Sequence, residues 1–140
     1  MWPFRPRLTG EEIRYISGLA HDGMVFAVKY LKESNVDKAI EQVLEVKNFL
    51  GTLHKAKCVE RRFLFFSKEV PYWGEKEEED EADMKEIKDK IKKTLLRIEE
   101  LINYLKRISK LLLTDQIQKE AIEKVYAVGE DVTTVYKLLQ

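Results

Sequence analysis

Apolar residues recur at intervals of three and four along most of the chain, a spacing typical of amphipathic α-helices. The first stretch has a clear start, because Thr9 and Glu12 are spaced to form a capping box. We predict a helix over residues 10–33, preceded by an extended N-terminal segment over residues 1–9. The apolar stripe of this helix consists of Ile13, Ile16, Ala20, Met24, Ala27, Val28 and Leu31.

A second helix is expected after a very tight turn, because residues 34–37 repeat the capping pattern and end on an acidic residue. We predict this helix over residues 35–69, running past Val59 to Phe66. It should end near Pro71, because the residue before a proline is disfavoured in helical geometry. The early part of its apolar stripe is Val36, Ala39, Ile40, Val43, Val46, Leu50 and Leu53.

The third apolar stripe is a heptad repeat, and it predicts a helix over residues 82–113. A fourth helix is predicted over residues 115–139, because Asp115 followed by Gln118 resembles a helix cap. One register of the heptad repeat holds Met84, Ile91, Ile98, Leu105 and Leu112, and the other holds Ile87, Thr94, Leu101 and Ile108. The stripe of the fourth helix holds Ala121, Val125, Val128, Val132, Val135 and Leu139.

Four helices joined by two tight turns and one longer loop predict a single all-α domain over residues 1–140. The expected architecture is an antiparallel four-helix bundle with up-down-up-down topology, because short connections place successive helices side by side in opposite directions. At 1.5 Å per residue, the outer helices would be about 36 Å long and the two central ones about 50 Å. The two long central helices should therefore overhang at one end. We find no alternation typical of β-strands.

The charges of the chain sum to zero, but acidic and basic residues are concentrated in different segments. Its 140 residues contain 25 Lys and Arg against 25 Asp and Glu, and 44% hydrophobic residues supply a core without disulfides. We predict an acidic loop over residues 71–81, since residues 75–83 hold seven acidic side chains against Lys76. Any electrostatic function must therefore come from separate patches of opposite sign.

The overhanging end of the predicted bundle also collects aromatic residues. These rings could form a satellite core beneath the N-terminal segment, or they could form a surface for a protein partner or a second copy. We predict that the partner-binding residues are Trp2, Phe4, Phe63, Phe66, Tyr72 and Trp73.

Basic residues in the same region support an alternative function. Cations that track phosphates, interleaved with rings that stack on bases, are typical of proteins that bind single-stranded nucleic acid. The neighbouring acidic run opposes this interpretation, because it would repel phosphate. The candidate nucleic-acid-binding residues are Lys55, Lys57, Arg61, Arg62 and Lys68.

Two short resemblances concern the histidines. Arg14 and His21 are spaced in a way that is similar to the R-x(4–6)-H motif of HEPN-type ribonucleases, and this resemblance covers these two residues. The stretch LHKAKC, with His54 and Lys57, partly resembles the motif of histidine phosphotransfer domains, which are also four-helix bundles. Those domains have a small residue, typically glycine, where this chain has Cys58. The two resemblances imply RNA cleavage and phosphorelay respectively.

Neither a metal site nor a cofactor is predicted. His54 and Cys58 could supply two ligands, but a zinc site needs three or four, and no Glu-x-x-His pair of a di-iron bundle is present. A single cysteine excludes an intramolecular disulfide and fits a reducing compartment. Because we find no secretory signal and no apolar run of membrane-spanning length, we expect a cytoplasmic protein without membrane contact.

The Glu- and Lys-rich composition with few amides resembles that of hyperthermophile proteins, although long helices in mesophiles give a similar composition. Taken together, these patterns predict a non-catalytic helical interaction or assembly module. It would dock a protein partner or another copy, as a homo-oligomer, through the aromatic- and charge-rich end of the bundle. The alternative is a nucleic-acid-associated helical subunit, with a HEPN-like ribonuclease as its catalytic form.

Overall fold

Side-chain caps determine where the first two helices begin. The computed structural model describes residues 7–58 and 73–140. Helix α1 (Gly10–Lys32) starts at the predicted capping box: the Glu12 amide donates to Thr9 Oγ1 at 3.0 Å, and the Thr9 amide donates to Glu12 Oε1 at 2.9 Å. Helix α2 (Val36–Lys55) follows a tight turn in which Ser34 has a φ of 61° and Asn35 Oδ1 accepts from the Lys38 amide at 3.1 Å. The predicted start of the first helix is confirmed, and the second helix begins one residue later than predicted, with Asn35 as its cap.

The predicted end of the second helix is wrong. Helix α2 ends at Lys55, Ala56 is extended, and residues 57–58 form strand β2 (Lys57–Cys58). This strand pairs in parallel with β1 (Arg7–Leu8), so its backbone bonds to the N-terminal segment and does not continue the helix. The Ala56 carbonyl accepts a hydrogen bond from Lys88 Nζ at 2.6 Å. The rest of the predicted extension, residues 59–69, lies outside the described residues.

Helix α4 (Trp73–Ile108) begins earlier and ends earlier than predicted. It begins inside the segment predicted as an acidic loop, and acidic residues favour the positive N-terminal end of a helix. It ends at Ile108, where the Ser109 hydroxyl donates to the Lys106 carbonyl at 2.7 Å and the chain turns back. The heptad repeat therefore does not reach Leu112, whose side chain is 88% exposed.

Helix α5 (Asp115–Leu138) is capped by Thr114, and not by Asp115 as predicted. Thr114 Oγ1 accepts from the Ile117 amide at 3.2 Å. Gln118 has a different role from the one expected. Its side-chain Nε2 donates to the Leu31 carbonyl at 2.6 Å and so pairs a carbonyl that the end of α1 leaves without a helical partner.

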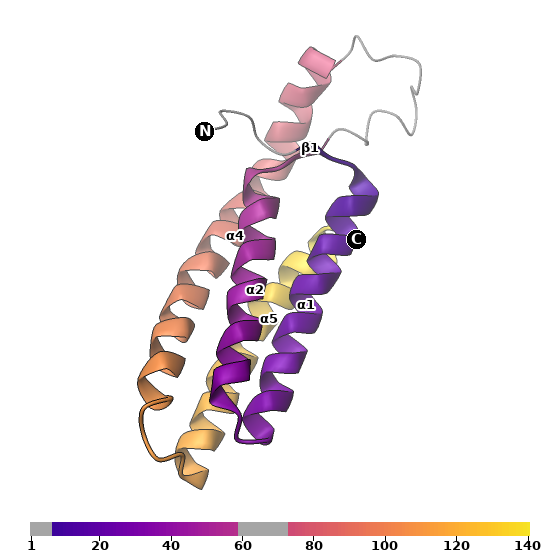
Figure 1. Cartoon of the computed structure of the whole chain (residues 1–140). Helices are drawn as coiled ribbons and strands as arrows, with labels where there is room; N and C mark the ends of the chain where they lie inside the picture. Colours follow the sequence, from indigo (N-terminus) through magenta and orange to yellow (C-terminus); the bar gives the residue numbers. More distant parts are fainter. Residues whose placement is uncertain (1–6, 59–72) are drawn as a thin grey trace, which may run out of the picture.

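The four helices form an all-α bundle in which successive helices run in opposite directions, as predicted (Figure 1). Helix α1 packs against α2 and α5, and α4 packs against the same two helices. The expected overhang is present on one helix: Lys88 is level with the end of α2, so the start of α4 extends beyond it (Figure 1).

The core consists of the predicted apolar stripes, and its two buried polar side chains within the described residues bond to their own helices. Thr94, which interrupts the heptad repeat, donates to the Lys90 carbonyl at 2.8 Å, and Ser17 donates to the Arg14 carbonyl at 2.8 Å. Each hydroxyl is thereby hydrogen-bonded, so neither side chain leaves an unpaired donor in the core. The most deeply buried large side chains include Leu31, Leu50, Ile91, Ile98, Leu105, Val125 and Val132.

Over residues 7–58 and 73–140, none of the helices has both the length and the apolar character that crossing a bilayer requires.

Candidate partner-binding groove

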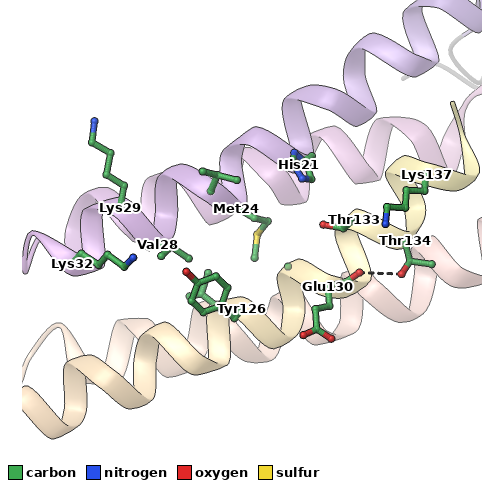
Figure 2. A pocket seen from close by; sticks show the side chains of 13 residues that line it. His21, Met24, Val28, Lys29, Lys32, Tyr126, Glu130, Thr133, Thr134 and Lys137 are labelled. Atoms are coloured by element: carbon green, nitrogen blue, oxygen red, sulfur yellow. Dashed lines mark hydrogen bonds between the residues drawn. The ribbon is translucent and has the colours of Figure 1, made fainter.

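A groove of about 780 Å³ follows the seam between α1 and α5 (Figure 2). It arises because the core stripes of these two antiparallel helices face inward, while the residues beside each stripe meet at the surface. We call this feature the α1/α5 groove. Its lining includes Met24, Val25 and Val28 from α1, and Val125, Tyr126 and Gly129 from α5.

The floor of the α1/α5 groove is fixed by close packing, and its walls are apolar and accessible. Met24 is buried, and a Cβ atom added at Gly129 would lie 3.8 Å from Met24 Cβ, so the two helices are in close contact at this level. Val25 is 55% exposed and Tyr126 is 53% exposed. An exposed valine and an exposed tyrosine beside a rigid floor form a ready apolar contact surface.

Charged residues lie at both ends of the α1/α5 groove. Lys29 and Lys32 line the end formed by the last turns of α1, and Lys137 lines the end formed by the last turn of α5. The carboxylate in the lining belongs to Glu130, which lies between these ends (Figure 2). The rim therefore carries more positive than negative charge.

His21 also lines the groove and is held by an aromatic neighbour. Its ring stacks on Tyr136 with the ring centroids 5.1 Å apart, and its Nδ1 lies 3.5 Å from Asp22 Oδ1. Arg14, its partner in the ribonuclease-like spacing, is exposed on the same helix. The arrangement gives the imidazole a packing role at the α5 side of α1.

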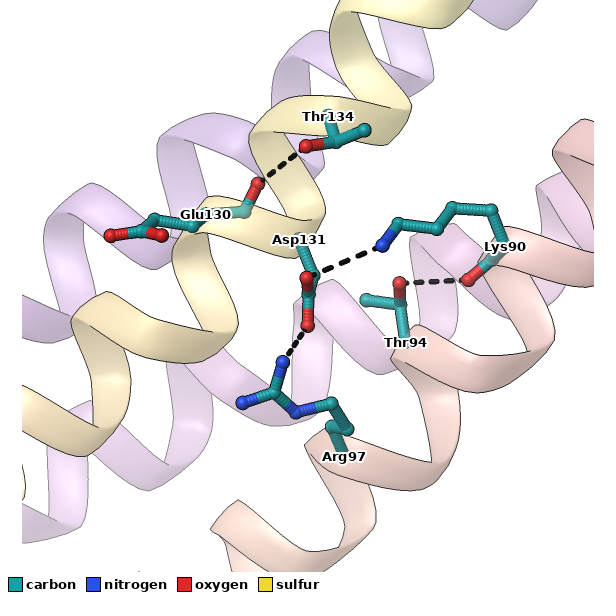
Figure 3. A network of polar contacts seen from close by, with 6 residues as sticks. All are labelled: Lys90, Thr94, Arg97, Glu130, Asp131 and Thr134. Carbon is teal, nitrogen blue, oxygen red and sulfur yellow. Dashed lines mark hydrogen bonds and ion pairs between the residues drawn. The ribbon is translucent and has the colours of Figure 1, made fainter.

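On its other side, α5 is tied to α4 by a polar network (Figure 3). Asp131 forms ion pairs with Arg97 and, at 3.4 Å, with Lys90, while only 18% of its side chain is exposed. Farther along the same seam, the Tyr104 hydroxyl donates to Glu120 Oε1 at 3.2 Å. Burial, together with this bond to Glu120, raises the pKa of Tyr104 to about 12. These contacts set the rotation of α5 and so fix which of its residues face the groove.

A second groove, of about 690 Å³, lies between α2 and α4. Its lining includes Lys47, Lys55 and Lys92, but Lys47 forms an ion pair with Glu99 across the seam. Leu96 is 62% exposed at its edge. Within residues 7–58 and 73–140, no aromatic residue lines this second groove.

Most of the site residues predicted from the sequence fall outside the described part of the chain, so their role stays a prediction. Lys55 is exposed at the end of α2 and lines the second groove, Lys57 lies in β2, and Trp73 is the first residue of α4. The predicted residues outside the described ranges are Trp2, Phe4, Arg61, Arg62, Phe63, Phe66, Lys68 and Tyr72.

The sequence did contain a signal for the α1/α5 groove. Val25 and Tyr126 are apolar residues that fall one position away from the buried stripe of their helices, next to Met24 and Val125. An apolar residue displaced from the stripe on each of two neighbouring helices marks an exposed seam. The pairing of α1 with α5 was needed to bring the two residues together.

Among the residues that the structure describes, no three His, Cys, Asp or Glu side chains are grouped so that they could hold a metal ion. Comparisons of the chain with known protein families, curated proteins and solved structures give no match.

Proposed function

We propose that this protein is a non-catalytic helical interaction module that binds a helical segment of a protein partner in the α1/α5 groove. One observation carries the proposal: two antiparallel helices, locked by a common core, expose Val25 and Tyr126 over a buried floor between charged ends. Such a seam is where a further helix packs in a bundle, with its side chains between the ridges of the two helices.

Tyr126 is the expected anchor of the interaction. Tyrosine supplies a large apolar area with few rotatable bonds, and for this reason it is enriched among the residues that dominate binding energy. Val25 would flank the anchor and exclude water from it, and the buried side chains of Val28 and Met24 would support both residues from below.

The nucleic-acid alternative draws less support from the described residues. Of its five basic candidates, Lys55 has a described side chain, and it lies in the second groove, where Lys47 is already paired with Glu99. Among the described residues that line the second groove, Lys55 has no aromatic ring beside it on which a base could stack.

The test is selection of displayed helical peptides against the folded full chain. Selected peptides are then titrated against wild type, Tyr126→Ser and Val25→Ser. We expect both substitutions to weaken binding by about tenfold or more, since each removes exposed apolar area and leaves the core untouched. The matched control is Leu96→Ser, which removes an exposed leucine on the second groove and should leave the affinity unchanged.

Two results would contradict the proposal. One is a selection that yields no peptide bound more tightly than a scrambled sequence. The other is a set of peptides whose affinity falls with Leu96→Ser but not with Tyr126→Ser, which would move the interaction to the α2/α4 seam.

A further inference from the structure

We propose that the segment bound in the α1/α5 groove is an amphipathic helix with acidic residues at both ends of an apolar stripe. This inference rests on the proposed function and names the chemistry of the partner. The observation behind it is the order of groups along the seam (Figure 2): Lys32 lies at one end, an apolar stretch follows, then the polar side chains of His21, Thr133 and Thr134, and Lys137 lies at the other end.

The positions of the cations follow from helix geometry. Met24 of α1 and Gly129 of α5 are level with each other, because a Cβ atom at Gly129 would lie 3.8 Å from Met24 Cβ. Lys32 lies two turns beyond Met24, and Lys137 lies two turns beyond Gly129. Since the helices are antiparallel, the two lysines lie about 12 Å from the common level in opposite directions.

The lysine side chains are turned toward a ligand in the groove. The amines of Lys32 and Lys137 point toward the middle of the groove from its two ends, whereas Lys29 points outward (Figure 2). Their Cα atoms are about 24 Å apart along the axis, and the inward side chains shorten the span that a partner must bridge. Carboxylates about 11 to 15 residues apart on one face of a helix, three or four turns, match this span.

The middle of the groove disfavours a partner helix that has acidic residues at the centre of its apolar stripe. Tyr126 and Val25 present exposed apolar surface there over the buried Val28, and the carboxylate of Glu130 points away from α1 (Figure 2). A partner with acidic residues at the centre of its stripe would place them over apolar side chains and far from both lysines, which costs affinity. The groove therefore distinguishes acidic ends from an acidic centre.

The experiment uses three synthetic helical peptides of about 18 residues with the same apolar stripe, a length set by the span of the groove. The first has glutamates at both ends, the second has the same glutamates at the centre, and the third has lysines at both ends. Each is titrated calorimetrically into the full chain. We expect the first peptide to bind at least about tenfold more tightly than the other two, and its affinity to fall as salt rises.

Charge reversal supplies the matched comparison. In the double variant Lys32→Glu with Lys137→Glu, the preference should invert, so that the peptide with basic ends binds most tightly. The control variant Lys106→Glu with Lys119→Glu changes the net charge equally at exposed positions outside the groove, and it should retain the wild-type preference.

Equal affinity for the three peptides would overturn the inference, as would a preference that the control variant inverts just as well. If affinity still falls with Tyr126→Ser while charge order has no effect, the proposed function stands and the acidic-ended partner is wrong. If none of the peptides binds and the display selection also fails, the proposed function falls with it.

Discussion

The two sides of helix α5 contrast sharply, although neighbouring residues of one helix form them. Toward α4, Asp131 pairs with Lys90 and Arg97, and its carboxylate is largely covered. Toward α1, the adjacent Glu130 lines an open groove with Tyr126 and Lys137. Asp131 on the α4 side is paired within the fold, whereas the Lys137 amine on the α1 side points into the groove (Figures 2 and 3).

This difference shows how a bundle can combine a rigid scaffold with a binding surface. The ion pairs between α5 and α4 fix the rotation of α5 about its own axis. The α1/α5 groove therefore presents a constant set of side chains, and its own charged residues are not needed to hold α5 in place. A groove of this kind is preorganised, and preorganisation reduces the entropy lost when a partner binds. The same contrast can be tested at single positions.

The largest expected effect is on the free energy of unfolding, and it distinguishes Met24 in the floor of the groove from Val25 in its wall. Met24→Ala should destabilise the fold by about 2–5 kcal/mol, because it removes a buried side chain and leaves a cavity between α1 and α5. Val25→Ala, one residue along, should change stability by less than about 0.5 kcal/mol, since Val25 is mostly exposed. Urea denaturation measures both. Equal losses for the two variants would show that the groove wall is part of the core.

The next effect separates Asp131 from Glu130. Asp131→Asn should cost about 1–2 kcal/mol, because Lys90 and Arg97 lose their common partner; the loss stays below that of a fully buried pair, since both cations remain accessible to water. Glu130→Gln should have little effect on stability. Urea denaturation at low and high salt checks this, and the cost of Asp131→Asn should shrink in high salt. An equal or greater cost for Glu130→Gln would refute the proposed division of roles.

The helices themselves could be predicted from the sequence, because amphipathic periodicity and capping act over a few residues. The capping box at Thr9, the turn at Asn35 and the burial of Ile91 and Ile98 all follow from such local rules. The end of α2 could not be predicted in this way. It depends on the pairing of β2 with β1, which joins segments far apart in the sequence.

The candidate site required the same long-range information. Tyr126 and Val25 are ordinary helix residues until α1 and α5 are known to be neighbours, and Lys32 and Lys137 belong to opposite ends of one groove because these helices are antiparallel. Composition pointed instead to the overhanging end of the predicted bundle, where the sequence places many aromatic residues. A density of aromatic residues along the chain says little about which of them share a surface.

The smallest expected effect is a pH dependence on the α4 side of α5. Burial, with the hydrogen bond to Glu120, raises the pKa of Tyr104 to about 12, above its value of 10.0 in an unfolded chain. The folded state therefore holds this proton more tightly, and the resulting stabilisation is complete below pH 10 and is lost as pH rises from 10 toward 12. Because solvent screens this surface pair, the contribution should be below about 1 kcal/mol.

Replacement of the hydroxyl isolates this contribution. Urea denaturation of wild type and Tyr104→Phe at about pH 9 and about pH 11.5, on either side of the normal tyrosine pKa, should show a steeper loss of stability in wild type. The matched control is Tyr126→Phe, which removes a hydroxyl from the groove side of α5 and should keep the wild-type slope. Any pH dependence that the three proteins share cancels in this comparison, so the difference between slopes reports on Tyr104. Identical slopes for wild type and Tyr104→Phe would mean that the bond to Glu120 does not couple ionisation to folding, and that the polar contacts of α5 with α4 act through Asp131 instead.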